Sequence, residues 1–299
     1  MSELGKLLRT QGLTPRALAA WAGTDRISAL PIEALVERDP TPAAIALALF
    51  VAGRDVEIDR LHLPIDELVA RGLVEVTGST VHAEVAILPA GASLIVCDRA
   101  GAPPTSDRVC WPDDSSYHLA GAIPRGRVDH WLDLGCGSAF APLVRPDAAA
   151  AITGIELNAE AARMAALGAE LSGVQHVGVE VGDLATQQPP AQLVTCNAPM
   201  PSFGIEIWRH TDDDFFQRLW RVLPERVVSG GLAIVHAALS AIPHERLEGD
   251  RRIVVYTPPD VAHAFAVLWW RPDAPERLAI SHRPLTAERP HVDDGDREP

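Results

Sequence analysis

Hydrophobic and polar positions follow a strand and helix alternation from Val128 onward. Seven short apolar runs predict strands: HWLDL, AAITGIEL, VGVEV, QLVTC, GLAIVHAAL, RIVVYT and AFAVLWW. The clearest helical stretches between them are NAEAARMAALGAELSG and DDDFFQRLWRVLPERV. Alternation at this spacing is typical of an α/β fold with a doubly wound, mostly parallel sheet. We therefore expect one seven-stranded α/β domain over residues 128–285.

The first 97 residues have a different pattern. Residues 2–22 and 41–52 have helical periodicity, and a short helix is expected after Pro64 in the sequence IDELVARG. The stretch LVEVTGSTVHAEVAIL alternates around a Gly-Ser pair, which predicts a β-hairpin. Helices followed by a hairpin favour a smaller, winged-helix-like domain over residues 1–97.

Two further segments differ in composition from these domains. Residues 98–127 are rich in Pro, Gly, Asp and Ser, which predicts a linker between the two domains. Within it, SSYHLAGAI is expected to be a short helix capped by a serine. Residues 286–299 contain many acidic residues and are expected to form a loose acidic tail.

Composition narrows the class of protein. An apolar fraction of 47% and a charged fraction of 22% in 299 residues allow a substantial core. The net charge of −14 disfavours a phosphate backbone as partner, although a local basic patch would still allow one. No apolar run reaches the ~18–20 residues of a membrane span, and no secretory signal is evident, so we expect a cytoplasmic protein without membrane contact. The four cysteines are far apart, and neither they nor the histidines have metal-ligand spacing.

The strongest chemical signal follows the first strand of the second domain, in WLDLGCGSAF. An acid, Asp133, ends the strand, and Gly135 and Gly137 allow the backbone to approach a ligand closely. A dinucleotide site would have a third glycine where this chain has Phe140. An acid before the first glycine suits a ligand with a cationic amine instead.

Two more acids end the next two strands. Glu156, in GIELN, can accept hydrogen bonds from both hydroxyl groups of a ribose. Asp183, in GDL, can accept one from the exocyclic amine of adenine, with Leu184 against the ring. The carboxyl ends of successive parallel strands are where doubly wound sheets bind ligands.

DLGCGSA, ELN and GDL, in this order and at this spacing, resemble the S-adenosylmethionine site of class I methyltransferases. The resemblance covers residues 115–271 and implies a Rossmann-like doubly wound sheet. It implies that S-adenosyl-L-methionine is the cofactor and methyl donor, with no metal. Carried over, the cofactor-binding residues are Asp133, Gly135, Gly137, Glu156, Leu157, Asp183, Leu184 and Asn197.

The fourth strand ends in TCNAPMP, which resembles the Asn-Pro-Pro-Tyr motif of amino-methyltransferases that act on adenine, guanine or glutamine nitrogens. In that motif the asparagine oxygen and a following backbone carbonyl orient the target NH₂. The resemblance implies catalytic roles for Asn197 and Pro199. This chain has Ala198 and Met200 where the motif has proline and the stacking aromatic residue.

The remaining candidates concern the acceptor substrate. Phe203 or Trp208 could supply the missing ring, and His210 could act as a general base. Tyr117 and His118 precede the glycine loop, where the family often has a segment that closes over the cofactor. The candidate substrate residues are therefore Tyr117, His118, Met200, Phe203 and His210.

These observations predict an S-adenosylmethionine-dependent methyltransferase that N-methylates a small molecule, a peptide or a protein. Its N-terminal domain would shape or cover the acceptor site. One alternative is an RNA or DNA base N-methyltransferase. Another is a regulator that binds S-adenosylmethionine without turnover, which Met200 favours. An NAD-dependent oxidoreductase is disfavoured by the incomplete glycine pattern. The oligomeric state is left open.

Overall fold

The computed structural model describes residues 2–31, 41–103, 105–199, 214–257 and 264–283. The predicted acidic tail, residues 286–299, lies outside these ranges. Within them, no helix has both the length and the apolar character needed to cross a membrane.

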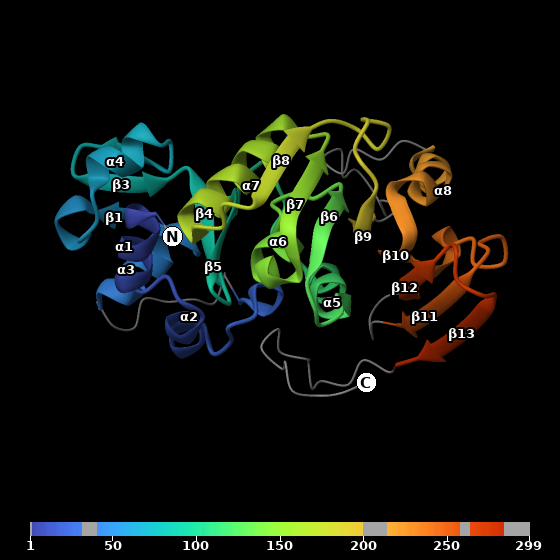
Figure 1. Ribbon diagram of the computed structural model, residues 1–299. Helices are drawn as coiled ribbons and strands as arrows, with labels where there is room; N and C mark the ends of the chain where they lie inside the picture. Colours follow the sequence, from blue (N-terminus) through green and yellow to red (C-terminus); the bar gives the residue numbers. More distant parts are fainter. Residues whose placement is uncertain (1, 32–40, 104, 200–213, 258–263, 284–299) are drawn as a thin grey trace.

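The central sheet has eight strands in the order β13-β11-β12-β10-β9-β6-β7-β8 (Figure 1). The strands are β6 (Val128–Leu134), β7 (Ala149–Glu156), β8 (Val177–Val181), β9 (Ala191–Asn197), β10 (Val227–Ala238), β11 (Asp250–Tyr256), β12 (Phe265–Arg271) and β13 (Arg277–His282). Parallel pairing joins β8, β7, β6, β9 and β10. Strand β12 is antiparallel to both of its neighbours. The prediction of a mostly parallel sheet is confirmed.

The predicted count of seven strands was one too few. The additional strand, β13, pairs with β11 at the edge of the sheet. Its two large apolar side chains, Leu278 and Ile280, are 45% and 54% exposed. A strand without a buried face has no continuous apolar run, so RLAISH lacked the pattern that marked the other strands.

Each face of the sheet has its own apolar core, because successive side chains of a strand alternate between faces. Trp131 and Leu193 belong to what we call the first face, which is covered by α5 (Asp114–Ala122), α6 (Phe140–Val144) and α7 (Ala159–Ser172). Leu132 and Val194 belong to the second face, which packs against α8 (Phe215–Arg226). Figure 1 shows α8 separated from the other three helices by the sheet.

The N-terminal residues form α1 (Glu3–Thr10), α2 (Pro15–Ala22), α3 (Pro42–Phe50) and α4 (Ile65–Ala70). The single helix predicted for residues 2–22 was wrong. It is interrupted at Gly12, which has φ +107° and lies so close to Ala43 that a Cβ would collide with it. Only glycine tolerates this combination of backbone angle and close approach.

The predicted hairpin consists of β2 (Val74–Thr77) and β3 (Thr80–Ala83), and β1 (Val56–Glu57) pairs with β3. The winged-helix-like interpretation of this arrangement stays a prediction. The hairpin ends sooner than expected, because residues 85–90 belong to a second hairpin. That hairpin joins β4 (Val85–Ala90) to β5 (Ser93–Asp98).

The second hairpin packs on α7 and joins the N-terminal region to the sheet domain. The Leu94 N–H donates to the Ser172 hydroxyl at 2.9 Å, and the Ser93 hydroxyl donates to the Leu143 carbonyl at 2.5 Å. The core of the first face includes side chains from α1, α3, β4, β5 and α7. This core is therefore continuous across the predicted boundary near residue 97.

The N-cap of α5 differs from the prediction. Asp113, not a serine, caps this helix by accepting the N–H groups of Ser115 (2.9 Å) and Ser116 (3.2 Å). The two serines lie inside the first turn, where their N–H groups lack helical partners and need such an acceptor.

Candidate active site

Four polar side chains share the first face at the carboxyl ends of the strands: Asp133, Thr195, Asn197 and His236. On its own strand, each lies an even number of residues after an apolar residue of the first face. Asp133, for example, lies two residues after Trp131 on β6. Because β6, β9 and β10 are parallel, their carboxyl ends meet at one edge of the sheet. Helix α5 packs against this part of β9 and β10.

The loop after β6 turns at two glycines. Gly135 has φ +67° and Gly137 has φ +55°, in the region that disfavours other residues. A Cβ on either glycine would meet no atom of the described residues within 4 Å, so the space beside both is open in this part of the structure. The Ile155 carbonyl holds the loop by accepting the N–H groups of Gly135 (2.8 Å) and Cys136 (3.2 Å). The loop can therefore admit a ligand close to its backbone.

Glu156 connects this loop to the following helix. Its carboxylate accepts the N–H of Gly137 at 2.7 Å and the N–H of Asn158 at 2.9 Å, each with a different oxygen. Asn158 in turn caps α7, as its position predicts. Each carboxylate oxygen has two acceptor positions, so each keeps one for a ligand hydroxyl.

Asp133 lies in the buried part of this edge and is 3% exposed. It accepts the hydroxyl of Thr195, whose oxygen accepts the indole N–H of Trp131 at 2.6 Å. Burial raises the pKa of Asp133 to about 7; the Thr195 hydrogen bond opposes this rise, and the nearby Glu156 charge adds to it. The carboxyl group therefore titrates near neutrality, and a cationic partner would favour its charged form.

Asp183 lies in the turn after β8, as predicted. Its carboxylate accepts the N–H of Ala185 at 2.8 Å and forms an ion pair with Arg218 of α8 at 3.5 Å. Leu184 is 7% exposed and packs in the core of the second face. In this structure Leu184 is therefore a core residue and not an open surface for a ring.

Open apolar surface lies instead beside Glu156. Leu157 is 51% exposed and Val181 is 60% exposed, and Val181 is the register partner of Glu156 on the neighbouring strand. Both are among the few large apolar side chains left exposed in the described residues. They offer a surface on which a flat apolar ligand group could rest.

Asn197 ends β9, next to His236 of β10. Its side-chain nitrogen donates to the Ser115 hydroxyl oxygen at 2.8 Å. Its side-chain oxygen, Oδ1, is buried and has no hydrogen-bond partner among the described residues. The next N–H, of Ala198, donates to the His236 carbonyl at 2.9 Å, and Pro199 follows half-buried. A buried acceptor atom without a partner marks a place where another group is expected to bind.

Aromatic side chains surround this end of β10. His236 is 1% exposed, its Nε2 bonds to the Tyr256 hydroxyl, and its ring stacks on Phe265 at a centroid distance of 6.2 Å. His118 of α5 packs against Tyr256 at 4.3 Å. Burial lowers the pKa of His236 to about 3, and His118 contributes to this effect. Both imidazoles have a buried Nδ1 that bonds to none of the residues described by the structure.

Tyr117 has a different environment from its neighbour His118. Its hydroxyl accepts the N–H of Ile27 at 3.0 Å, and its ring packs against Phe140 at 4.8 Å with the Arg26 guanidinium at the same distance. Burial raises its pKa to about 12. Tyr117 therefore joins α5 to the N-terminal region. These contacts do not indicate a role for Tyr117 in substrate binding.

The other candidate substrate residues, Met200, Phe203 and His210, lie outside the described residues, as does Trp208.

Several residues of this edge gave no signal in the sequence. Thr195 and Ser115 are common polar residues, and His236 and Tyr256 lie in ordinary strand patterns. Gly154 is a fifth case: a Cβ there would lie 2.6 Å from Cys136 Sγ, under the glycine loop. A glycine inside an otherwise apolar strand was the available signal for such a close approach.

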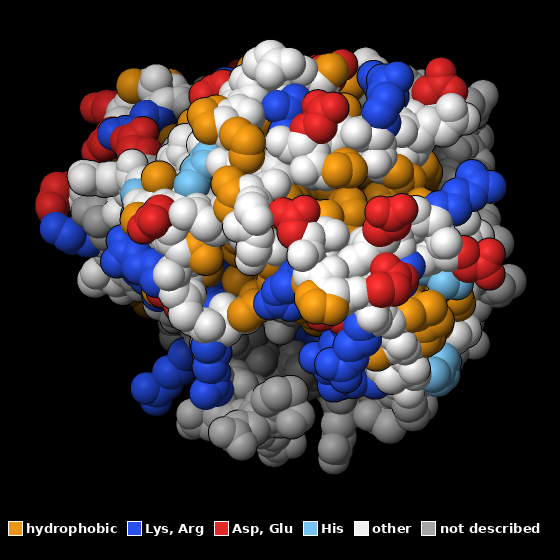
Figure 2. Space-filling view, turned by 45° about the vertical axis from the view of Figure 1, so that its right-hand side comes forward, with side chains coloured by type: hydrophobic (Ala, Val, Ile, Leu, Met, Phe, Trp, Pro, Cys, Tyr) orange, Lys and Arg blue, Asp and Glu red, His pale blue; other side chains and the backbone are white. Residues whose placement is uncertain are grey.

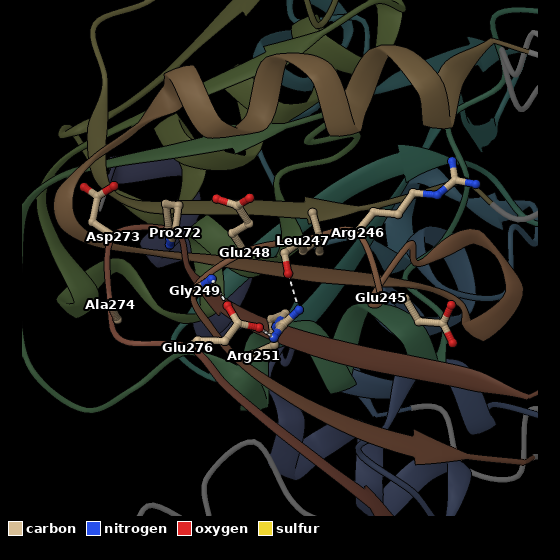
Figure 3. Close-up of a pocket in the computed structure, with 10 residues that line it drawn as sticks. All are labelled: Glu245, Arg246, Leu247, Glu248, Gly249, Arg251, Pro272, Asp273, Ala274 and Glu276. Atoms are coloured by element: carbon tan, nitrogen blue, oxygen red, sulfur yellow. Dashed lines mark hydrogen bonds and ion pairs between the residues drawn. The ribbon is translucent and has the colours of Figure 1, made fainter.

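A separate depression of about 540 Å³ lies where β11 begins and β12 ends, at the other ends of the strands from the glycine loop (Figure 3). There the buried Arg251 donates to the carbonyls of His244 and Leu247 and pairs with Glu276. Glu276 also accepts the Gly249 N–H at 2.8 Å. These bonds join two loops, and the depression lies far from the glycine loop.

Among the described residues, no group of three or more His, Cys, Asp or Glu side chains is arranged to hold a metal ion.

No protein-family model and no curated protein matches the sequence. Similar solved structures include a candidate class I S-adenosylmethionine-dependent methyltransferase from Listeria monocytogenes, with 15% identity and a TM-score of 0.42 over 56% of this chain. This chain spans only 62% of that protein. The precorrin-6y C5,15-methyltransferase from Geobacter metallireducens has 13% identity and a TM-score of 0.39, covering 56% of this chain and 92% of its own. The tRNA methyltransferase TrmK from B. subtilis has 18% identity and a TM-score of 0.38, and the match covers 53% of this chain and 66% of TrmK. TM-scores below 0.5 do not assign a function to this chain.

Proposed function

We propose that this chain is an S-adenosylmethionine-dependent methyltransferase. The observation that carries the proposal is the double hydrogen bond of Glu156, which fixes its carboxylate beside an open glycine loop. Asp133 lies on the same edge, and Leu157 is exposed next to Glu156. A ligand that fits this set has neighbouring hydroxyl groups, a cationic amine and a flat apolar ring. S-adenosylmethionine has all three.

In this proposal each part of the cofactor has its own residues. Gly135 and Gly137 accommodate the methionine part, whose amine favours the charged form of Asp133. Glu156 accepts the ribose hydroxyls. Leu157 and Asp183 flank the adenine, with Leu184 adjoining Asp183 in the core. The bound cofactor supplies a methyl group on a positively charged sulfur.

The acceptor atom in this proposal is a nitrogen. Asn197 lies on the strand next to β6. Its Oδ1 is a buried acceptor with no partner in the described ranges, so it suits an N–H of the acceptor. The carbonyl of Pro199 is the second candidate acceptor. Alignment of an amine with the methyl group by such contacts supplies much of the catalysis in a displacement reaction.

A small molecule, peptide or protein is the favoured acceptor class. The net charge is −14. On the face shown in Figure 2, the basic side chains of the described residues lie in several separate groups, some of them beside acidic side chains, and form no continuous stripe. A phosphate backbone would require such a stripe.

The N-terminal region is proposed to shape the acceptor side of the site. Ser28 donates to the Asp114 carboxylate at 2.6 Å, and Arg26 pairs with the same carboxylate at 3.1 Å. Asp114 begins α5, the helix that contacts Asn197. Residues 26–28 therefore help to hold the helix that borders the acceptor position.

Calorimetric titration with S-adenosylhomocysteine tests the cofactor assignment. Binding with a stoichiometry of one is expected. Absence of binding to a folded protein, as judged by a cooperative thermal transition, would refute the proposal.

Incubation with isotopically labelled S-adenosylmethionine and a size-fractionated cell extract tests the acceptor class. Label in the small-molecule or protein fraction is expected. Label in RNA or DNA, together with a gel shift at low salt that weakens as salt rises, would favour the nucleic-acid alternative. Binding without label in any fraction would favour the non-catalytic regulator.

A further inference from the structure

Helix α5 places a hydroxyl group against the amide of Asn197. The Ser115 oxygen accepts the Asn197 side-chain N–H at 2.8 Å. The same Ser115 hydroxyl donates to the carboxylate of Asp113, the N-cap of the helix. The three side chains form a hydrogen-bonded chain from the start of α5 to the end of β9, although Ser115 and Asn197 are 82 residues apart.

The chemistry of Asp113 determines the direction of every bond in this chain. An ionised carboxylate only accepts hydrogen bonds, so Ser115 gives its single O–H to Asp113. The Ser115 oxygen can then only accept, and the Asn197 amide must present its nitrogen. The amide oxygen therefore faces away from Ser115, where it is buried and bonds to no other described residue. If Ser115 lost its hydroxyl, neither orientation of the amide would be favoured by this bond.

We propose that Ser115 is a positioning residue for methyl transfer, fixing Asn197 so that Oδ1 accepts an N–H of the acceptor amine. This inference rests on the function proposed above. The amine nitrogen forms a bond to the methyl carbon with its lone pair, and the carbon–sulfur bond breaks with its electrons going to sulfur. The extra proton on nitrogen then leaves to water. Ser115 does not touch the reacting atoms and acts through Asn197.

Sinefungin tests this orientation without a known acceptor, because it is an S-adenosylhomocysteine analogue with an amine at the position of the transferable methyl group. In the wild-type protein the amine is expected to donate to Asn197 Oδ1, so sinefungin should bind more tightly than S-adenosylhomocysteine. Ser115→Ala should reduce this preference by about tenfold, the value of one hydrogen bond to a charged group. Its affinity for S-adenosylhomocysteine should stay within about twofold of the wild type.

Ser115→Thr keeps the hydroxyl and should keep the preference. Ser116→Ala is the matched control, because it removes the neighbouring hydroxyl of the same helix turn and leaves the chain intact. Ser115→Cys preserves the side-chain volume and provides a second test if the alanine variant does not fold. It should lose most of the preference, because a thiol is a weak donor and acceptor.

Each other outcome contradicts one of the two proposals. If the wild-type protein binds neither ligand, the proposed function fails. If it binds both ligands equally, Oδ1 does not face the methyl position and the Ser115 proposal alone fails. The same holds if Ser115→Ala and Ser115→Cys keep the preference, or if Ser116→Ala loses as much of it.

Discussion

The carboxyl edge of the sheet has two halves that differ in how their polar groups are satisfied. The cofactor half consists of Asp133, the glycine loop, Glu156 and Asp183, and each of these carboxylates has hydrogen-bond partners within the chain. The acceptor half consists of Asn197, His118, His236 and Tyr256. Within the part of the chain that the structure describes, it has three buried atoms without a hydrogen-bond partner: Asn197 Oδ1, His118 Nδ1 and His236 Nδ1.

The cofactor half is therefore already organised by its own hydrogen bonds, whereas the acceptor half lacks partners in the described chain for some of its polar atoms. A buried polar atom without a partner costs about 1–3 kcal/mol, and native proteins contain few of them. Three in one cluster leave the acceptor half, within the described residues, without the group that would complete it. The cofactor half keeps spare acceptor positions but leaves no carboxylate unsatisfied. The predictions below test whether the two halves respond separately.

The largest expected effect is the pH dependence of stability due to Asp133. Its pKa is raised to about 7 in the folded protein, against an ordinary value near 3.8. The folded state therefore binds more protons than the unfolded state between these values, and stability falls as pH rises from about 4 through 7. From pH 5 to 8 the loss from this group is about 3 kcal/mol.

Urea unfolding at pH 5 and pH 8 measures this loss, with Asp133→Asn as the reference for all other titrating groups. The asparagine variant should show a smaller decrease in the free energy of unfolding, by about 3 kcal/mol. An equal decrease in both proteins would mean that Asp133 does not titrate in this range. If the amine of S-adenosylhomocysteine lies beside the Asp133 carboxylate, the bound ligand should make the decrease in the free energy of unfolding of the wild-type protein smaller.

Glu156→Ala is expected to weaken S-adenosylhomocysteine binding by about 1–3 kcal/mol, or roughly 5- to 150-fold. The variant removes the acceptors for the ribose and releases the Gly137 N–H. Glu160→Ala is the control, because Glu160 lies four residues further along the chain, in α7, and its carboxylate forms an ion pair with Arg163 at 2.6 Å. Calorimetry at pH 8 measures both. Equal affinities for the two variants would show that Glu156 does not hold the ribose.

Tyr256→Phe tests the independence of the acceptor half. It removes the hydroxyl that bonds to His236 Nε2, so a second nitrogen of this buried ring loses its partner. The free energy of unfolding should fall by about 1–2 kcal/mol. Affinity for S-adenosylhomocysteine should be unchanged, since Tyr256 is not part of the cofactor half. A large loss of affinity would show that the two halves are coupled.

Leu157→Ala should have the smallest effect. Losing ~40 Å² of apolar contact at ~25 cal/mol per Å² costs about 1 kcal/mol, or about fivefold in affinity. Stability should barely change, because Leu157 is 51% exposed. Leu278→Ala, on the distant edge strand β13 and 45% exposed, should alter neither quantity. An unchanged affinity in the Leu157 variant would show that the adenine does not lie on this surface.

The sequence was informative for the cofactor half because its residues lie at strand ends, directly before turns and helices. Asp133, Glu156 and Asp183 each end or follow an apolar strand, so their position on one edge could be predicted from topology. Leu184 was the exception: its neighbour Asp183 was placed correctly, but its own side chain packs in the core of the second face.

The acceptor half could not be predicted in the same way. Its contacts join α5 to β9, and β10 to β11, so they depend on tertiary packing and not on spacing. Ser115 was expected only in connection with a helix cap, and His236 was one histidine within an apolar run. Asn197 was found through a resemblance, but the group that orients it became visible only in three dimensions.

The core that runs from the N-terminal helices to α7 limits how this molecule can open. A Cβ at Gly5 of α1 would collide with the carbonyl of Leu171 in α7, so the two helices touch backbone to backbone. Because β5 is also hydrogen-bonded to α7, the described part of the N-terminal region, residues 2–31 and 41–97, cannot move away as a hinged cover without disrupting the core of the first face. Ligands must enter and leave past the loops at the strand ends, and a truncated chain beginning at Val128 should be insoluble because α7 would lose its packing partners.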